Sequence, residues 1–161
     1  MKNEAKRYYM LEDGEDQADL YIFGDISSLG QWGEDDPTRS AYNIVKELQA
    51  VQAPSINVHI NSNGGDVSEG LAIYNTLKNS GKTVTTYCDG FACSAASVVF
   101  MAGSKRIMSN ASLLMIHNAW MFTMGNSSEL RKQADDLEKV NQTAVEAYKS
   151  VAKISEDDIK K

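Results

Sequence analysis

The sequence has few of the residues on which several large protein classes depend. Only two cysteines occur among 161 residues, Cys88 and Cys93, which is too few for a disulfide framework or a four-ligand zinc cage. We therefore expect both thiols to be reduced, and we expect no metal and no cofactor. No run of about twenty apolar residues is present, so the sequence predicts no membrane-spanning helix and no membrane partner.

Basic charge is also scarce relative to acidic charge. The formal net charge is −6, and 16 lysines and arginines are scattered among 22 acidic residues. Proteins that bind nucleic acids concentrate Lys and Arg on one face, so we expect no nucleic-acid partner. The N-terminal residues lack the apolar core of a signal peptide, which predicts a cytoplasmic location.

The length and the apolar content are those of one α/β domain. Hydrophobic residues make up 42% of the chain, and 161 residues are enough for one domain with a core but too few for two. Residues 1 to 17 are polar and acidic without a period and predict a flexible N-terminal arm, followed by a single domain over residues 18 to 161. From Ala18 onward, short β-rich runs alternate with helical periods, and this alternation predicts a mostly parallel sheet.

The expected elements follow from local patterns. Strands are expected over residues 18–23, 56–60, 83–87 and 113–116 and around Ile107, and helices are expected over residues 67–77, 94–102 and 127–153. A further helix is expected after Thr38, its candidate cap, with Ala41, Ile44, Val45 and Leu48 on one face. The helix from 127 has the most regular pattern, because its apolar residues recur at three- and four-residue steps, and Asn126 or Ser127 is its expected cap. A helix folded back on its own sheet remains an alternative to a projecting one.

Ser94 is the candidate nucleophile. It stands among small residues just before an apolar helical run, near a helix N-terminus that is electropositive and rich in free N–H groups. A serine hydroxyl needs a base within reach, and the sequence offers only His59 and His117. His117 is the better candidate, whereas His59 lies within an alternating strand pattern and receives no role. Ser97 is interpreted as a packing residue.

Gly64 and Gly65 follow the strand expected at residues 56–60. A phosphate loop would continue with Lys and then Ser or Thr, but Asp66 and Val67 occur here, so we expect no nucleotide binding. A residue without a Cβ lets the N–H of Gly65 approach a substrate carbonyl, and the N–H of Ala95 supplies a second donor. Gly65 and Ala95 are therefore the expected oxyanion hole.

Three motifs, in this order, resemble those of the ClpP peptidase family. They are Asn61-Ser62-Asn63-Gly64-Gly65-Asp66-Val67, the run Gly90-Phe91-Ala92-Cys93-Ser94, and Met115-Ile116-His117. The similarity covers about residues 18 to 155. It is greatest to the prophage-encoded, ClpP-related head maturation proteases, whose similar pattern includes residues 21–26 and 116–120. One such motif has little specificity, whereas three at the right spacing are specific.

The resemblance implies a ClpP/crotonase-like spiral of β-α units and a serine-type endopeptidase, with Ser94 as nucleophile and His117 as general base. It implies a homo-oligomeric ring, a heptamer or a double ring, in which the long C-terminal helix forms a handle. Protein or peptide substrates follow from the family, and capsid or scaffold proteins follow from the prophage subgroup. Whether an AAA+ ATPase partner docks is left open.

The C-terminal end departs from the family pattern. The family's triad acid lies beyond a helix that this sequence barely enters, so we expect the chain to be truncated there and identify no triad acid. Ser155 and Asp158 occupy capping-box-like positions. Asp157 and Asp158 are interpreted as first-turn acids that favour the helix dipole.

Three other functions remain open. A crotonase-fold acyl-CoA enzyme would share the spiral sheet and a glycine-built oxyanion hole but would use a carboxylate near the helix start. A catalytically silent, ClpP-like ring-forming scaffold would assemble without reacting with serine-directed inhibitors. A Ser–Lys peptidase similar to signal peptide peptidase A would need a lysine, and Lys105, the nearest one, does not fit that family's pattern.

Overall fold

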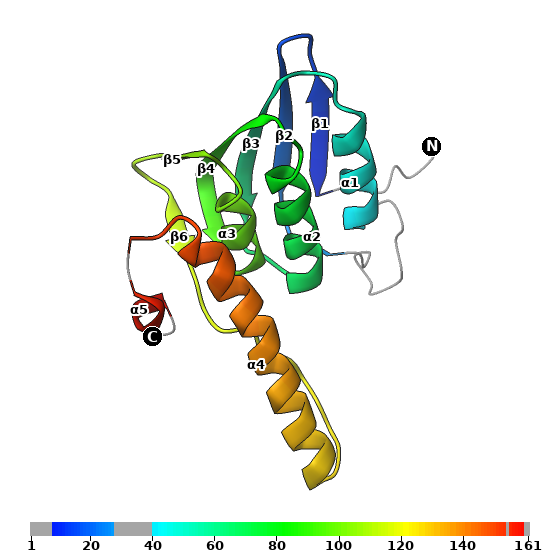
Figure 1. Ribbon diagram of the computed structural model, residues 1–161, viewed down its shortest axis with the longest axis vertical. Coiled ribbons are helices and arrows are strands. Elements are labelled where there is room, and N and C mark those ends of the chain that lie inside the picture. The colour runs from blue at the N-terminus through cyan, green and yellow to red at the C-terminus, as the bar shows by residue number, and fades with distance from the viewer. Residues whose placement is uncertain (1–7, 28–39, 154, 160–161) are drawn as a thin grey trace. The chain divides into compact units, whose positions relative to one another are not determined.

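The computed structural model describes residues 8–27, 40–153 and 155–159 (Figure 1). The chain divides into two compact units, Met1–Met115 and Ile116–Lys161. The single domain expected over residues 18 to 161 stays a prediction.

The first unit is built on a mixed, mostly parallel sheet. Its strands are β1 (Tyr9–Asp13), β2 (Gln17–Phe23), β3 (Ser55–Ser62), β4 (Thr83–Cys93), β5 (Lys105–Met108) and β6 (Leu113–Met115). The strand order is β1-β2-β3-β4-β5. Strand β4 pairs with β5 at residues 85–88 and with β6 at residues 91–93. Only the β1–β2 pair is antiparallel among the described strands. The predicted α/β class with a mostly parallel sheet is confirmed.

Strand β1 corrects the prediction of a flexible arm over residues 1 to 17. Tyr9 pairs with Ile22 and Asp13 pairs with Ala18, so Tyr9–Asp13 form the outer strand of a hairpin and residues 14–16 form its turn. The prediction was wrong because acidic residues of the turn dominate the local composition and mask the strand pattern. Strand β1 is held by its hydrogen bonds to β2, and a local sequence pattern does not record such pairing. Residues 1–7 of the predicted arm lie outside the described residues.

Three helices cover one face of this sheet (Figure 1). They are α1 (Ala41–Ala50), α2 (Val67–Lys78) and α3 (Ala95–Phe100). Alternate strand residues face them and form the core, with relative exposures of 0%: Leu20, Ile22, Ile56, Val58, Ile60, Thr86 and Cys88. This period of two follows from strand geometry, which sends successive side chains to opposite faces.

His59 lies on the opposite face of the sheet from Val58 and Ile60, as the alternation predicts. Its ring is stacked between Tyr21 and Tyr87, with centroid distances of 5.0 and 4.7 Å, and its Nδ1 is 2.8 Å from Oδ2 of Asp89. These contacts join the neighbouring strands β2, β3 and β4, so the His59 side chain helps to hold the sheet together.

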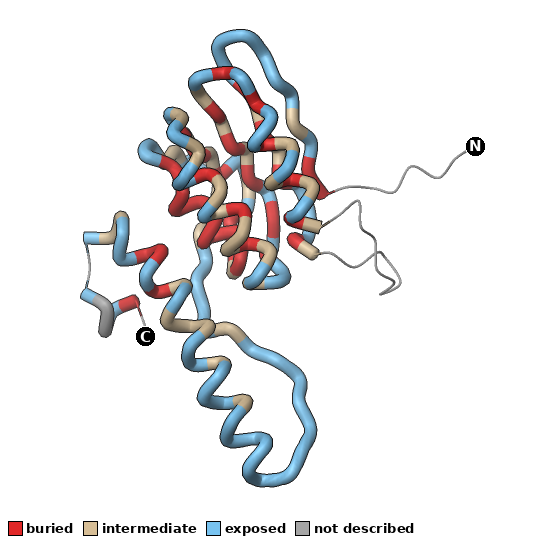
Figure 2. Tube along the Cα trace, turned by 45° about the vertical axis from the view of Figure 1, so that its right-hand side comes forward, coloured by how far each residue is buried: buried red, intermediate tan, exposed pale blue. Residues whose placement is uncertain are grey.

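The second unit contains α4 (Ser127–Lys149) and α5 (Glu156–Ile159). Asn126 caps α4 with a capping box, because its side chain accepts from the N–H groups of Ser128 and Glu129 while Glu129 accepts from the Asn126 N–H. The expected start at residue 127 is confirmed, and the helix ends four residues before the expected 153. Most of α4 is exposed (Figure 2). Within the described ranges, no helix is long and apolar enough to cross a membrane.

Candidate active site

Ser94 occupies a strained junction between strand β4 and helix α3. Its φ of 53° and ψ of −127° make it the only non-glycine residue with a positive φ in the described part of the chain. Such a conformation costs on the order of 1–3 kcal/mol and persists only where the surroundings impose it. A sharp strand-to-helix turn of this kind presents a nucleophilic side chain.

Backbone contacts on both sides hold Ser94 in this conformation. Its N–H donates to the carbonyl of Met115 on β6 at 2.9 Å, and its carbonyl accepts the N–H of Ser97 at 2.9 Å. The hydroxyl of Ser97 also donates to the Ser94 carbonyl, which agrees with the packing role inferred for Ser97. The Ser94 side chain makes no capping bond to α3, so its hydroxyl is not committed to the helix.

The turn at Gly64 and Gly65, here called the glycine turn, packs directly against Ser94. A Cβ on Gly64 would lie 2.6 Å from the Cβ of Ser94 and 2.9 Å from the nitrogen of Ala95. A Cβ on Gly65 would collide with the carbonyl of Ile26. Their φ values of 99° and 140° also favour glycine. The structure therefore brings the glycine turn, Ser94 and Ala95 together within the first unit.

The direction of the Gly65 N–H follows from two hydrogen bonds of Ile26. The Ile26 N–H donates to the Gly64 carbonyl, and the Ile26 carbonyl accepts the Asp66 N–H, both at 2.8 Å. In a trans peptide the C=O and the N–H point in opposite directions, so the Gly65 N–H points away from Ile26. No hydrogen bond found among the described residues uses this N–H or that of Ala95.

Two side chains at the end of β3 hold this arrangement, and sequence reasoning assigned them no role beyond their motif. Oγ of Ser62 accepts the N–H of Gly64 at 3.0 Å. Oδ1 of Asn61 accepts the N–H of Phe91 at 3.1 Å, beside Gly90, where a Cβ would lie 2.5 Å from that oxygen. The available signal was the position of Asn61 and Ser62 three and two residues before Gly64.

The cysteine next to Ser94 is not a competing nucleophile. Burial raises the pKa of the Cys93 thiol, and the nearby Cys88 adds to this shift, so the thiol stays protonated at neutral pH. Both cysteines are free. Among the described residues, no group of three or more His, Cys, Asp or Glu side chains could hold a metal ion.

His117 belongs to the second unit, and its side chain is exposed. In the sequence it follows Met115, whose carbonyl accepts the Ser94 N–H, by two residues. At the other end of the unit, the N–H of Asp158 donates to Oγ of Ser155 at 3.2 Å, as expected of a capping residue. The side chain of Asp157 lies outside the described residues, and no triad acid is assigned.

The geometry bears on two of the alternative functions. Lys105 pairs with Thr85, nine residues before Ser94 on β4, and nine extended residues span about 30 Å. This separation disfavours a Ser–Lys peptidase. The first turn of α3 contains no acidic residue, which disfavours an acyl-CoA enzyme with a carboxylate at that position.

Comparisons with known proteins agree with this fold. A family model described as Clp protease matches residues 31–161. The ATP-dependent Clp protease proteolytic subunit of Deinococcus radiodurans is 36% identical over 117 residues, which cover 69% of this chain and 57% of that protein. Subunit 1 of Rhodopirellula baltica is 34% identical over 129 residues, covering 73% of this chain and 57% of that protein. The subunit of Bacteroides thetaiotaomicron is 35% identical over 108 residues, which cover 66% of this chain and 48% of that protein.

The chain spans about half the length of the curated relatives that it matches. These relatives are Clp protease proteolytic subunits, so the finer resemblance to prophage head maturation proteases stays a prediction. The family model covers most of the chain, and the sheet, the glycine turn and the long C-terminal helix accord with it. The chain belongs to the Clp protease family.

Proposed function

We propose that this chain is a serine endopeptidase in which Ser94 is the nucleophile and His117 is the general base. The observation that carries the proposal is the conformation of Ser94, a strained residue at a helix start packed against the glycine turn. Family membership supports it. The order of the motifs also supports it, because His117 follows the strand whose Met115 holds the Ser94 backbone.

The reaction is acyl transfer. His117 takes the proton of the Ser94 hydroxyl while Oγ forms a bond to the peptide carbonyl, and the N–H groups of Gly65 and Ala95 bind the resulting oxyanion. Collapse breaks the C–N bond, and the departing amine takes the proton from His117. Water then attacks the acyl-enzyme with His117 again as base, which releases the second product and restores Ser94.

The substrate is a protein or peptide bound as an added strand. Strand β6 pairs with β4 alone among the described strands, which leaves its other edge available for a peptide. Recognition through backbone hydrogen bonds tolerates many sequences. For the prophage subgroup suggested by the motifs, the substrates are capsid or scaffold proteins processed in the cytoplasm.

A homo-oligomeric ring, a heptamer or a double ring, is part of this proposal. Support comes from the segment before α4, where Trp120, Phe122 and Met124 are 67%, 91% and 94% exposed. A contiguous exposed apolar stretch is typical of an interaction surface.

A catalytically silent ring-forming scaffold is the second candidate. One observation favours it: the long, mostly exposed helix α4 follows an exposed apolar segment that contains Phe122 and Met124. Such a protein would assemble without an activated serine.

Reaction with a fluorophosphonate, followed by intact-mass spectrometry, separates the two candidates. We expect one adduct on the wild-type chain, none on Ser94→Ala, and one on the control Ser112→Ala, whose hydroxyl bonds only locally to the Ser109 carbonyl. Cleavage of a mixed peptide library should be lost in Ser94→Ala alone. An unlabelled wild-type chain would favour the scaffold, and an adduct that persists in Ser94→Ala would exclude Ser94 as the nucleophile.

A further inference from the structure

In the turn between β3 and α2, hydrogen bonds fix the peptide groups on both sides of the Gly65 N–H. The N–H of Gly64 is bound by Oγ of Ser62 at 3.0 Å. The carbonyl of Gly64 is bound by the Ile26 N–H, and the N–H of Asp66 is bound by the Ile26 carbonyl, both at 2.8 Å. The Gly65 N–H, the candidate oxyanion donor, lies between these restrained groups.

This turn needs external restraint because glycine supplies none. Gly64 and Gly65 are consecutive, both have positive φ, and residues without a Cβ have the widest choice of backbone conformations. Rotation of the peptide between them would turn the Gly65 N–H away from its present direction. An oxyanion donor works only within about 2.7–3.1 Å of the developing charge, so a small rotation removes its effect.

Ser62 is placed to supply this restraint through its side chain. It is 2% exposed, and it pairs with Ala92 on β4, two residues before Ser94. A serine hydroxyl that accepts the N–H two residues ahead closes a tight turn. Ser62 therefore links the strand that leads to Ser94 with the turn that carries the Gly65 N–H.

We propose that Ser62 is a positioning residue of the oxyanion hole: its hydroxyl holds the Gly64 N–H and thereby keeps the Gly65 N–H directed at the substrate carbonyl. The inference rests on the proposed function. Ser62 itself does not touch the reacting atoms. Its contribution is expected in the transition state, where the oxyanion forms, and not in the binding of the uncleaved peptide.

Ser62→Ala tests the proposal by separating kcat from KM. We expect kcat for a fluorogenic peptide to fall about 10- to 100-fold, less than or equal to the loss of one oxyanion donor, with KM within about twofold. The affinity for a peptide aldehyde, which mimics the tetrahedral intermediate, should fall by the same factor as kcat, while that for a product peptide stays constant. Ser62→Thr keeps an Oγ and should restore kcat.

Thr86→Val is the matched control. Thr86 is also fully buried, and its hydroxyl donates to the Phe100 carbonyl at 2.8 Å, without a contact to the glycine turn. We expect this variant to lower the unfolding temperature and to leave the ratio of aldehyde affinity to product affinity unchanged. Should Ser62→Ala fail to fold, Ser62→Cys, a weaker acceptor, should show an intermediate loss of kcat.

The outcomes distinguish this inference from the proposed function. A wild-type chain without turnover or fluorophosphonate labelling would overturn both. An active wild-type chain would overturn the inference alone if Ser62→Ala or Ser62→Cys kept the wild-type kcat. The same follows if Ser62→Ala changed aldehyde and product affinities equally, as a general loss of structure would.

Discussion

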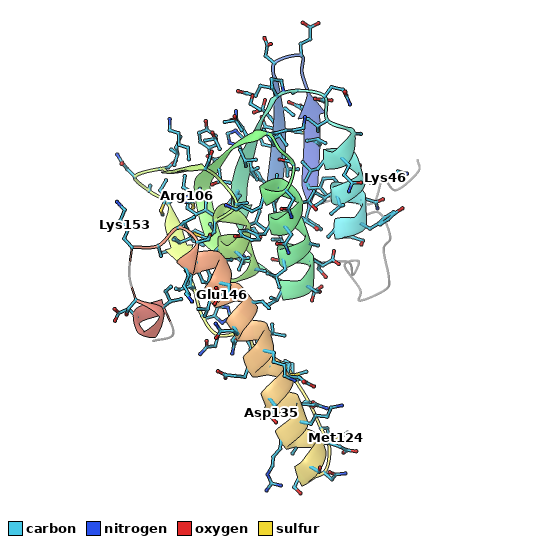
Figure 3. All side chains as sticks on the ribbon, viewed as in Figure 1. Lys46, Arg106, Met124, Asp135, Glu146 and Lys153 are labelled. Atoms are coloured by element: carbon cyan, nitrogen blue, oxygen red, sulfur yellow. The ribbon has the colours of Figure 1, made fainter. Side chains whose placement is uncertain are left out.

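Among the described residues, most of the buried large apolar side chains lie in residues 8–115, whereas the two most exposed ones lie in residues 116–159. In the first unit, Leu20, Ile60 and Ile73 are 0% exposed within the layer between the sheet and its helices. In the second unit, Phe122 and Met124 are 91% and 94% exposed. Figure 3 labels Met124 in the segment that leads into α4. The first unit thus has a core of its own, whereas the second displays apolar surface that its own helix does not cover.

The hydrogen bonds and ion pairs differ in the same way. The sheet of the first unit joins segments far apart in sequence, such as β2 and β3. Helix α4 is supported mostly by contacts between near neighbours, such as the Asn126 capping box and the pair of Lys139 with Asp136, at 2.8 Å. Exposed pairs of this kind contribute little to stability. The bond from the Ala119 N–H to Oδ1 of Asn141, at 2.7 Å, spans 22 residues. The comparison teaches that Ser94, Gly65 and Ala95 belong to the unit with long-range order, whereas His117 belongs to the other unit.

Deleting one large side chain from each unit should give the largest contrast. Leu20→Ala removes a fully buried side chain and should lower the free energy of unfolding by about 2–5 kcal/mol. Phe122→Ala removes an exposed one and should change it by less than about 0.5 kcal/mol. Urea unfolding followed by circular dichroism, at concentrations where the chain is monomeric, measures both. Equal losses would contradict the difference between the units.

Adding one methyl group to a glycine of each unit should give the next largest contrast. Gly64→Ala meets Ser94 and requires a positive φ, which should cost about 2–4 kcal/mol. Gly125→Ala meets the Glu129 side chain, whose Oε2 accepts the Asn126 N–H in the capping box, and should cost about 0.5–1 kcal/mol. Gly81→Ala is the control for backbone strain alone, because nothing lies within 4 Å of its Cβ; about 1 kcal/mol is expected. Thermal unfolding ranks the three variants.

The strain at Ser94 predicts a smaller effect. Ser94→Gly relieves the positive φ, whereas Ser94→Ala retains it, so the glycine variant should be about 1 kcal/mol more stable than the alanine variant. Both lose the nucleophile, and activity therefore does not confound the comparison. Chemical unfolding of the two variants measures the difference, and a more stable alanine variant would show that the conformation is not strained.

The smallest effect is expected in α4 and depends on pH. The hydrogen bond from Lys139 lowers the pKa of Asp136 below its ordinary 3.8, and Asp136 raises the pKa of Lys139 above its ordinary 10.5. The stabilisation is therefore present between these values. It is lost as the pH falls through the lowered pKa of Asp136 or rises through the raised pKa of Lys139. Asp136→Asn should reduce helicity slightly at pH 7 and leave it unchanged at pH 2; an equal effect at both pH values would contradict the pair.

Much of the fold could be predicted from local patterns. The alternation at Ile56, Val58 and Ile60 and the helical period after Ser127 both specify the elements that form there, because burial on one face imposes a period of two or 3.6. Strand β1 could not be predicted in this way. Its residues depend on pairing with β2, and an acidic turn separates the two strands.

The candidate site was predictable in part. Ser94, Gly65 and Ala95 follow from small residues in recurring motifs, and their roles stay predictions. The contact of Gly64 with Ser94 was not predictable, because 29 residues separate the glycine turn from the helix start. The hydrogen bond of Ser62 was equally hidden, because serine and glycine are common in turns of many kinds.

The sequence by itself determined the local choices: which segments become strands or helices, where α4 is capped, and which serine precedes a helix. Those choices depend on neighbours within a few residues, and short-range periods and capping preferences record them. Tertiary structure alone decided that Ile26 and the turn at Gly64 and Gly65 meet beside Ser94. The reason is physical: the positive φ of Ser94 and the direction of the Gly65 N–H are maintained by hydrogen bonds and close packing between segments distant in the chain.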